Sequence, residues 1–341
     1  MFGVKVTDYD RQVWEEELSD FVPEKIIDCH VHIYLKEMQR ENPDERKGCV
    51  AWPHIVAPEL DGEDLKESYS QMFPGRKFGA VVMGMPTCRL DEVNAFALSE
   101  AKKNGWPALY CTNWDTTKDE IRAAFAKGFV GIKPYLNNCP PYIPEGEVRI
   151  FDFLTHEHLE LMNELEAPVM LHIPRALRLR DPVNLAQMME IEEKYPRAKI
   201  IYAHVGRAYA PEDIGNAFEI LKNTEHLKFD FTANVLPEAI SKCVEAVGTD
   251  RLMFGSDMPI TKMRMYRIVE NGKYINVVPR GAYGDVSYDS HMRESDEKEI
   301  TTFMYEEMRA LKKSAKELGL TKEDVNKIMY GNASKLFGYE L

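Results

Sequence analysis

The sequence predicts an α/β protein with a (β/α)8 TIM barrel that carries insertions after strands 1 and 8. Three observations lead to this expectation. Eight short apolar runs recur along the 341 residues, segments with helical periodicity separate them, and no Pro/Gly/Ser-rich linker divides the chain. Near-continuous apolar runs are typical of parallel strands that are covered on both faces. The number of runs and the length of the chain favour a closed barrel over an open, doubly wound sheet.

The predicted strands are brief and rich in Val, Ile, Leu, Phe and Tyr. They cover residues 25–34, 78–86, 107–115, 128–136, 168–174, 199–207, 227–234 and 251–259. We assign residues 1–24 to an N-terminal extension and residues 25–341 to a single barrel domain.

The segments between the strands have the periodicity of amphipathic helices. Residues 91–104 place their apolar side chains on one face, and Gly105 is expected to end this helix. Residues 211–223 and 237–247 each begin with a proline, which the first turn of a helix tolerates.

Two further helices are expected after the last strand. Ser295 is the predicted N-cap of a long helix whose apolar stripe runs from Ile300 to Ala315. A short helix is expected after Thr321, where Asp324 is placed to complete the cap.

Residues 35–77 and 260–294 exceed what a minimal barrel needs. The second insertion contains Asn271-Gly272 between two alternating runs, which predicts a β-hairpin with a type I′ turn. Both insertions leave the C-terminal ends of strands, where barrel active sites lie, so we expect them to cover the substrate. Within them, His54 and His291 either enter the site from above or, on the more conservative interpretation, lie at the surface.

Composition excludes several classes of function. A formal net charge of −13 argues against nucleic-acid binding, which needs basic patches. No apolar run is long enough to predict a membrane helix, and the acidic N-terminal segment is not typical of a secretory signal. The six cysteines show no CxxC spacing, which indicates reduced thiols and a cytoplasmic protein.

Potential metal ligands stand at the ends of several predicted strands. His30 and His32 are two residues apart, so strand alternation places both imidazoles on one face. His172, His204 and Asp257 end three other strands, and all these ends meet at one rim of a parallel barrel. A lone histidine at a strand end is more often structural, but a converging set of this size is hard to attribute to chance. Imidazole and carboxylate suit zinc, and also manganese, iron or nickel.

The motifs DCHVHIY, MLHIP, YAHVGR and FGSDMP resemble the metal-site motifs of the amidohydrolase superfamily. The resemblance is closest to the amidohydrolase-related branch, which includes aminocarboxymuconate-semialdehyde decarboxylase and several lactonases, and it covers roughly residues 25–338. MYGNASKLFG is similar to the short helix that closes this family. The resemblance implies one divalent metal ion, with zinc as the first choice and manganese as the second, bound by His30, His32, His172 and Asp257.

The same resemblance implies that His204 lies beside the metal and polarises substrate or water. We predict Asp257 and His204 as the catalytic residues. Asp257 would hold a water molecule and shuttle its proton, and His204 would hydrogen-bond a developing oxyanion. A carboxylate that merely caps a loop is the alternative for Asp257.

Four residues are predicted to bind substrate. Lys133 ends the fourth strand, where binuclear superfamily members carry a carbamylated lysine between two metals; in this usually mononuclear branch we interpret it as a contact to a substrate anion. Tyr135 follows it, and Arg175 and Arg207 follow two of the strand-end histidines. Guanidinium groups match carboxylates in a bidentate manner. An ordinary salt bridge stays open for Lys133, as does pairing with acids such as Asp181 for the arginines.

The predicted function is a metal-dependent hydrolase that uses activated water on an ester, lactone or amide bond of a small carboxylated or sugar-derived substrate. The alternative is a metal-dependent non-oxidative decarboxylase or hydratase of a small organic acid. A catalytically silent binding protein would show a damaged ligand set, whereas this set is intact. The expected partner is a small anionic molecule, and pairing through the helices would give a homodimer.

Overall fold

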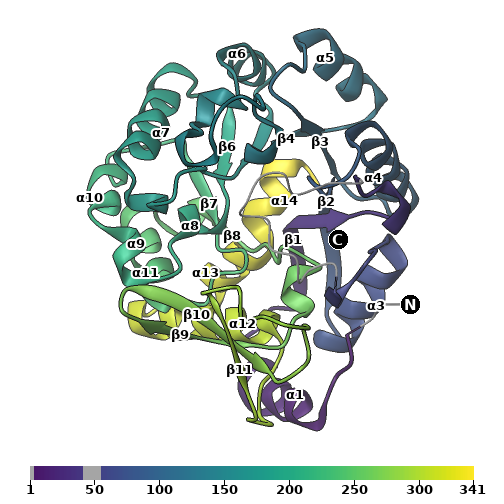
Figure 1. Cartoon of the computed structure of the whole chain (residues 1–341), viewed down its shortest axis with the longest axis vertical. Coiled ribbons are helices and arrows are strands. Elements are labelled where there is room, and N and C mark those ends of the chain that lie inside the picture. Colours follow the sequence, from purple (N-terminus) through teal and green to yellow (C-terminus); the bar gives the residue numbers. More distant parts are fainter. Residues whose placement is uncertain (1–3, 41–54) are drawn as a thin grey trace.

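The computed structural model describes residues 4–40 and 55–341 and shows a barrel of eight parallel strands (Figure 1). The strands follow chain order around the sheet: β1 Lys25–Ile33, β2 Lys77–Gly84, β3 Ala108–Thr112, β4 Gly131–Pro134, β5 Pro168–Leu171, β6 Lys199–Tyr202, β7 Lys228–Asp230 and β8 Leu252–Met253. The Cys29 amide donates to the Phe254 carbonyl at 3.0 Å, and Val31 bridges Met258 in parallel. These contacts join β1 to the β8 segment and confirm the predicted barrel.

Helices surround the barrel, and most of them connect its strands (Figure 1). They are α3 Gly62–Met72, α4 Leu90–Asn104, α5 Lys118–Lys127, α6 His156–Leu165, α7 Pro182–Lys194, α8 His204–Arg207, α9 Pro211–Ile214, α10 Ala217–Leu221, α11 Pro237–Val247, α12 Phe303–Leu318, α13 Lys322–Asn326 and α14 Asn332–Phe337. Gly105 ends α4 with a φ of 71°, as expected for a C-terminal glycine. The Thr321–Asp324 capping box begins α13, which confirms that prediction.

Two helix predictions were wrong in detail. Residues 211–223 form α9 and α10 instead of one helix, because the backbone turns at Gly215, where φ is 53°. A Cβ atom there would lie 2.7 Å from Cβ of Arg180, so only glycine fits. The N-cap of α12 is Thr302 rather than Ser295, because Ser295 ends a strand that pairs with the hairpin.

The insertion after β8 forms the predicted hairpin. Strands β9 Tyr266–Glu270 and β10 Lys273–Pro279 pair antiparallel about Asn271 and Gly272, whose φ angles are 49° and 74°. Positive φ at both central residues is the type I′ geometry. Strand β11 Met292–Ser295 then adds to β10 in parallel. The predicted His54 lies outside the described residues.

The two ends of the barrel differ in polarity. Ile27, Cys29, Met83 and Met170 belong to an apolar cluster inside the ring, and Ala333 and Phe337 of α14 pack against it. This C-terminal helix therefore closes the end of the barrel that lies away from the strand-end histidines. The strand-end histidines line a cavity at the opposite end.

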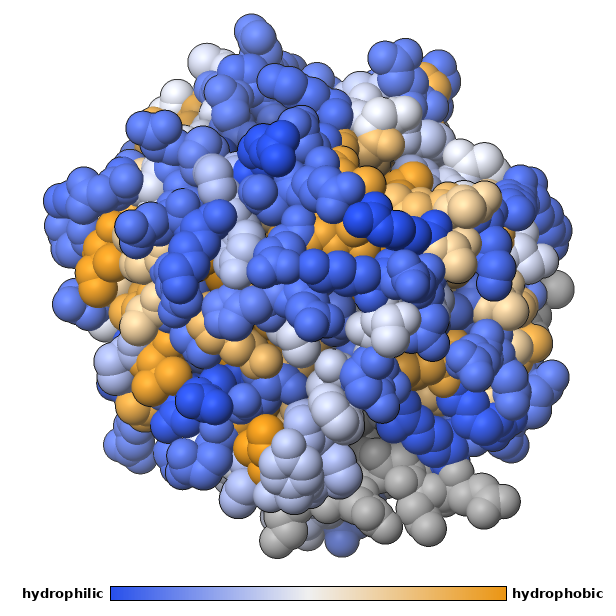
Figure 2. Space-filling model, turned by 90° about the horizontal axis from the view of Figure 1, so that it is seen from above, coloured by the Kyte–Doolittle hydropathy of each residue, from blue (hydrophilic) through white to orange (hydrophobic). Residues whose placement is uncertain are grey.

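The segment of residues 4–24 packs against α12 and contributes side chains such as Trp14 to the main apolar core. It contains α1 Asp8–Val13 and a π-helical segment, Trp14–Leu18. Trp14 stacks on Tyr305 of α12 with ring centroids 6.3 Å apart, and Arg264 forms an ion pair with Asp10 at 2.5 Å. Figure 2 shows a mostly hydrophilic face with separate apolar patches. No helix in the described part of the chain is long and apolar enough to span a bilayer.

Candidate metal centre

A β-bulge in β1 turns the first two histidines into the barrel. Asp28 pairs with Ala80 and Val31 pairs with Val82, so three steps on β1 match two on β2. Because of this extra residue, Cys29 contributes to the interior cluster while His30 and His32 line the cavity. The shared orientation predicted for the two imidazoles is therefore present.

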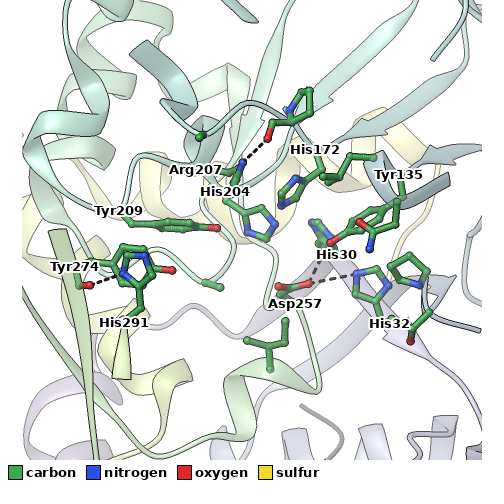
Figure 3. Close-up of a pocket in the computed structure, with 18 of the residues that line it drawn as sticks. His30, His32, Tyr135, His172, His204, Arg207, Tyr209, Asp257, Tyr274 and His291 are labelled. Carbon is green, nitrogen blue, oxygen red and sulfur yellow. Dashed lines mark hydrogen bonds and ion pairs between the residues drawn. The ribbon is translucent and has the colours of Figure 1, made fainter. Parts of the chain in front are cut away.

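Asp257 lies between these imidazoles (Figure 3). Its Oδ1 is 3.3 Å from Nε2 of His32 and 3.6 Å from Nε2 of His30. Ligand atoms of all three residues lie within 4.8 Å of one another, and all three residues are buried. His172 is not part of this tight group: its ring centroid lies 5.0 Å from that of His204 and 5.4 Å from that of Tyr135. Its role as a ligand stays a prediction.

Three histidines are held through Nδ1 by oxygen acceptors. A carboxylate or carbonyl can only accept, so Nδ1 carries the proton and Nε2 keeps its lone pair in each neutral ring. In His30 this lone pair faces Nζ of Lys133 at 3.1 Å. The contacts are His30 with Asp230 Oδ2 at 3.0 Å, His32 with the Gly84 carbonyl at 2.9 Å, and His204 with the Thr232 carbonyl at 2.9 Å. Such anchoring of the second nitrogen is the usual support of metal-binding histidines.

The donor set fits a divalent metal. Nδ1 of His172 is buried and has no hydrogen-bond partner among the described residues, which is costly unless a ligand compensates. With the lone pairs of His30 and His32 and the carboxylate of Asp257, it would complete a set of three nitrogens and one oxygen. That composition suits zinc.

Electrostatics give the predicted ligands the protonation states that a metal needs. Burial lowers the pKa of His30 to about 3 and that of His172 well below its ordinary value, so both rings are neutral at pH 7. Burial raises the pKa of Asp257, but its interactions with His32 and His204 outweigh this effect and hold that pKa below its usual range. Neutral imidazoles and an ionised carboxylate are the metal-binding forms.

The two predicted catalytic residues both have left-handed backbone conformations. The φ angle is 61° at His204 and 59° at Asp257. The amide of Asp257 donates to the His30 carbonyl at 2.8 Å, and that of His204 donates to Asp230 Oδ1 at 2.7 Å. These hydrogen bonds hold an unfavourable conformation, as is common at functional sites.

Lys133 is buried on β4, directly beside the cluster. Its Nζ lies 3.1 Å from Nε2 of His30, and the structure shows no ion pair between it and a carboxylate of the described residues. Burial lowers its pKa to about 8 despite the negative charges of Asp257 and Asp230. Tyr135 lines the cavity next to it. Lys133 therefore adjoins the cluster but does not line the cavity, whereas Tyr135 lines it.

The two predicted arginines differ in position. Arg207 lines the cavity, and its guanidinium donates to the carbonyls of Ile173 and Pro174 at 3.3 and 3.0 Å. Arg175 does not line the cavity; its Nε lies 3.1 Å from Asp181, the acid considered as its alternative partner. Substrate binding by Arg175 stays a prediction without a contact that favours it.

The cavity has a volume of about 500 Å³, which suits a small molecule. Sequence reasoning missed several of its polar wall residues and the carboxylate behind the cluster, namely Tyr209, Arg267, Tyr274, Asn276 and Asp230. His291 also lines the cavity and stacks on Tyr274, so the surface interpretation was wrong for it. The predicted hairpin after strand 8 indicated where this wall lies. For Asp230, the sequence offered one indication, an acidic residue within the apolar run of β7.

Comparisons with known proteins identify the family and the fold. A family model described as amidohydrolase matches residues 27–273. No curated protein sequence matches the chain significantly.

Several solved structures share the fold at low sequence identity. An amidohydrolase from Burkholderia multivorans with bound zinc has a TM-score of 0.62 at 14% identity, over 92% of this chain and 99% of that one. A probable 2-pyrone-4,6-dicarboxylic acid hydrolase from Acinetobacter baumannii, with citric acid bound, has a TM-score of 0.56 at 15% identity. That match covers 92% of this chain and 99% of the other. The 4-oxalomesaconate hydratase from Rhodopseudomonas palustris has a TM-score of 0.54 at 17% identity, over 92% of this chain and 95% of the other.

Proposed function

The chain belongs to the amidohydrolase family of enzymes, and from this premise we propose that it is a metal-dependent hydrolase of small carboxylated or sugar-derived esters, lactones or amides. The observation that carries the proposal is the buried group of His30, His32 and Asp257, whose Nε2 lone pairs and carboxylate converge at the cavity. The probable hydrolase from A. baumannii and the zinc-containing structure from B. multivorans support the choice of reaction and metal.

His30, His32, His172 and Asp257 would hold the cation. We propose one zinc ion, with manganese as the second choice, because imidazole and carboxylate donors suit both. When bound, a divalent cation lowers the pKa of a water molecule and polarises a substrate carbonyl.

Protein groups would then manage the protons and charges of the reaction. Asp257, ionised at neutral pH, accepts the proton of the attacking water and returns it to the leaving oxygen or nitrogen. Nδ1 of His204 is committed to the Thr232 carbonyl, so its Nε2 donates to a developing oxyanion only when the ring is protonated. Lys133, Tyr135 and Arg207 would contact the anionic parts of the substrate.

The first test is metal analysis of protein purified without chelator or a histidine tag. We expect about one equivalent per chain, lost in His172→Ala and Asp257→Ala but kept in His226→Ala, which removes a histidine outside the cavity. A panel of carboxylated lactones, esters and amides is then screened for acid release. No metal after reconstitution with zinc and manganese would refute the proposal, and two equivalents would favour a carbamylated Lys133.

A non-oxidative decarboxylase or hydratase is the second candidate. Lys133 gives it a specific basis, because a buried ammonium group beside the cluster can protonate the carbon that remains after carbon dioxide leaves. The hydratase from R. palustris shares the fold. Carbon dioxide release or water addition, without ring opening, would favour this candidate.

We also propose a cytoplasmic homodimer that binds neither nucleic acid nor membranes. The net charge of −13 opposes phosphate binding. Light scattering of the purified protein would test the oligomeric state, and a monomeric mass would contradict the dimer.

A further inference from the structure

We propose that Arg267, on β9 of the inserted hairpin, binds a carboxylate of the substrate remote from the bond that is cleaved. The inference rests on the proposed function and narrows its substrate class to acids with a distal carboxylate. Arg267 lines the same cavity as the cluster. Its neighbours Tyr209 and Tyr274 lie across this cavity from His32 (Figure 3).

The guanidinium of Arg267 is fixed but not saturated. Its Nε donates to Oδ1 of Asn276 at 2.9 Å, and Asn276 is its register partner on β10. One terminal nitrogen reaches the Ala233 carbonyl at 3.5 Å. An arginine has five N–H donors, so most of the fork remains available for an acceptor in the cavity.

The charge of Arg267 has no carboxylate partner in the described part of the chain. The neighbouring Arg178 pairs with Asp213 at 2.6 Å, whereas no ion pair is found for Arg267. Asp289 and Glu145 line the cavity as well, but neither forms an ion pair with it. Burial lowers the pKa of Arg267, which reflects the cost of this unpaired charge. A substrate carboxylate would offset that cost.

Aromatic rings orient the guanidinium. Its central carbon lies 4.6 Å from the ring centroid of Tyr274, 5.0 Å from that of Tyr209 and 5.1 Å from that of Phe303. Aromatic rings stabilise the face of a guanidinium and leave its N–H edge free for an in-plane, bidentate carboxylate. The alternative role, a cation–π contact that only stabilises the hairpin, would not make binding depend on ligand charge.

Calorimetry on the zinc-loaded full chain separates these roles. The probes are benzene-1,2-, 1,3- and 1,4-dicarboxylate, each with its uncharged diamide. We expect Arg267→Gln to weaken the best dicarboxylate about 10- to 100-fold, as loss of a charge-assisted bidentate contact does. Arg267→Lys, which keeps the charge without the fork, should lose less. The control is Arg293→Gln. It removes an exposed arginine on β11 that forms an ion pair with Glu270 on β9, and this variant should bind the dicarboxylate like the wild type.

Three results would overturn the inference. In the first, the wild-type protein binds none of the dicarboxylates more tightly than the matching diamide. In the second, Arg267→Gln leaves the affinity for the dicarboxylate unchanged. In the third, Arg267→Gln lowers the affinities for dicarboxylate and diamide equally. If Arg267→Gln fails to fold, Arg267→Lys carries the same comparison. Binding needs no turnover, so a protein that binds dicarboxylates through Arg267 but hydrolyses nothing would refute only the proposed function.

Discussion

Replacing Asp230 by asparagine should disable the metal site without touching a ligand. Oδ2 of Asp230 accepts from Nδ1 of His30 at 3.0 Å, and Oδ1 accepts from the amides of His204 and Thr232 at 2.7 and 3.2 Å. Both oxygens therefore act as acceptors, whereas an asparagine amide offers only one acceptor oxygen and one NH2 donor group. In either orientation, an NH2 group meets an N–H group.

The backbone amides are fixed, so the ring of His30 is the group that changes its tautomer. Its proton moves from Nδ1 to Nε2 in Asp230→Asn, and the lone pair that faces Asp257 is lost. Loss of such supporting hydrogen bonds typically weakens metal binding about 10- to 100-fold. Competition with a chromophoric zinc chelator at pH 7.5 measures the affinity. Asp181→Asn is the control, because Asp181 is also buried but lies outside the cavity lining. An unchanged zinc affinity in Asp230→Asn would refute the argument.

Three further predictions concern stability. Burial lowers the pKa of His172 in the folded, metal-free protein. As the pH falls below about 6.5, the unfolded chain therefore binds a proton at His172 that the folded chain does not bind. The free energy of unfolding then decreases as the pH decreases. His172→Asn should flatten this decline by up to about 1.4 kcal/mol per pH unit in urea unfolding between pH 6 and 5, and parallel curves would contradict it. Arg264→Met leaves the buried carboxylate of Asp10 unpaired and should cost about 3 kcal/mol, seen as a lower melting temperature. Thr302→Ala removes the N-cap of α12 and should cost about 1 kcal/mol, which Thr302→Ser should restore in the same denaturation assay.

The fold could be predicted because its signals are local. Each barrel strand is an apolar run short enough to distinguish from a helix, and Gly105 or Pro237 marks where helices end and begin. The errors arose where tertiary structure overrides local pattern. Ser295 is a good N-cap residue by type, but β10 recruits it into a strand. The turn at Gly215 depends on the proximity of Arg180, which no local pattern encodes.

The strand-end ligands could be anticipated because parallel strands deliver their C-terminal residues to one rim. His30, His32 and Asp257 converge by that rule, with the bulge in β1 turning the two histidines into the cavity, and they form the tight group. Arg267 could not be anticipated, because its orientation depends on the register between β9 and β10 and on how the hairpin docks. Arginines beside the motifs, such as Arg175, were the visible candidates, yet Arg175 pairs with an acid outside the cavity lining.

The site therefore divides into parts with different structural origins. The predicted ligands and their hydrogen-bond supports come from the barrel, where Asp230 on β7 links His30 on β1 to the backbone of His204 after β6. The opposite wall comes from an inserted hairpin that the barrel does not need for closure. Changes at Arg267 should therefore alter which acids bind while leaving metal content intact, whereas changes at Asp230 should do the reverse. Such a separation allows one rigid metal centre to serve different substrates through changes in the insertion alone.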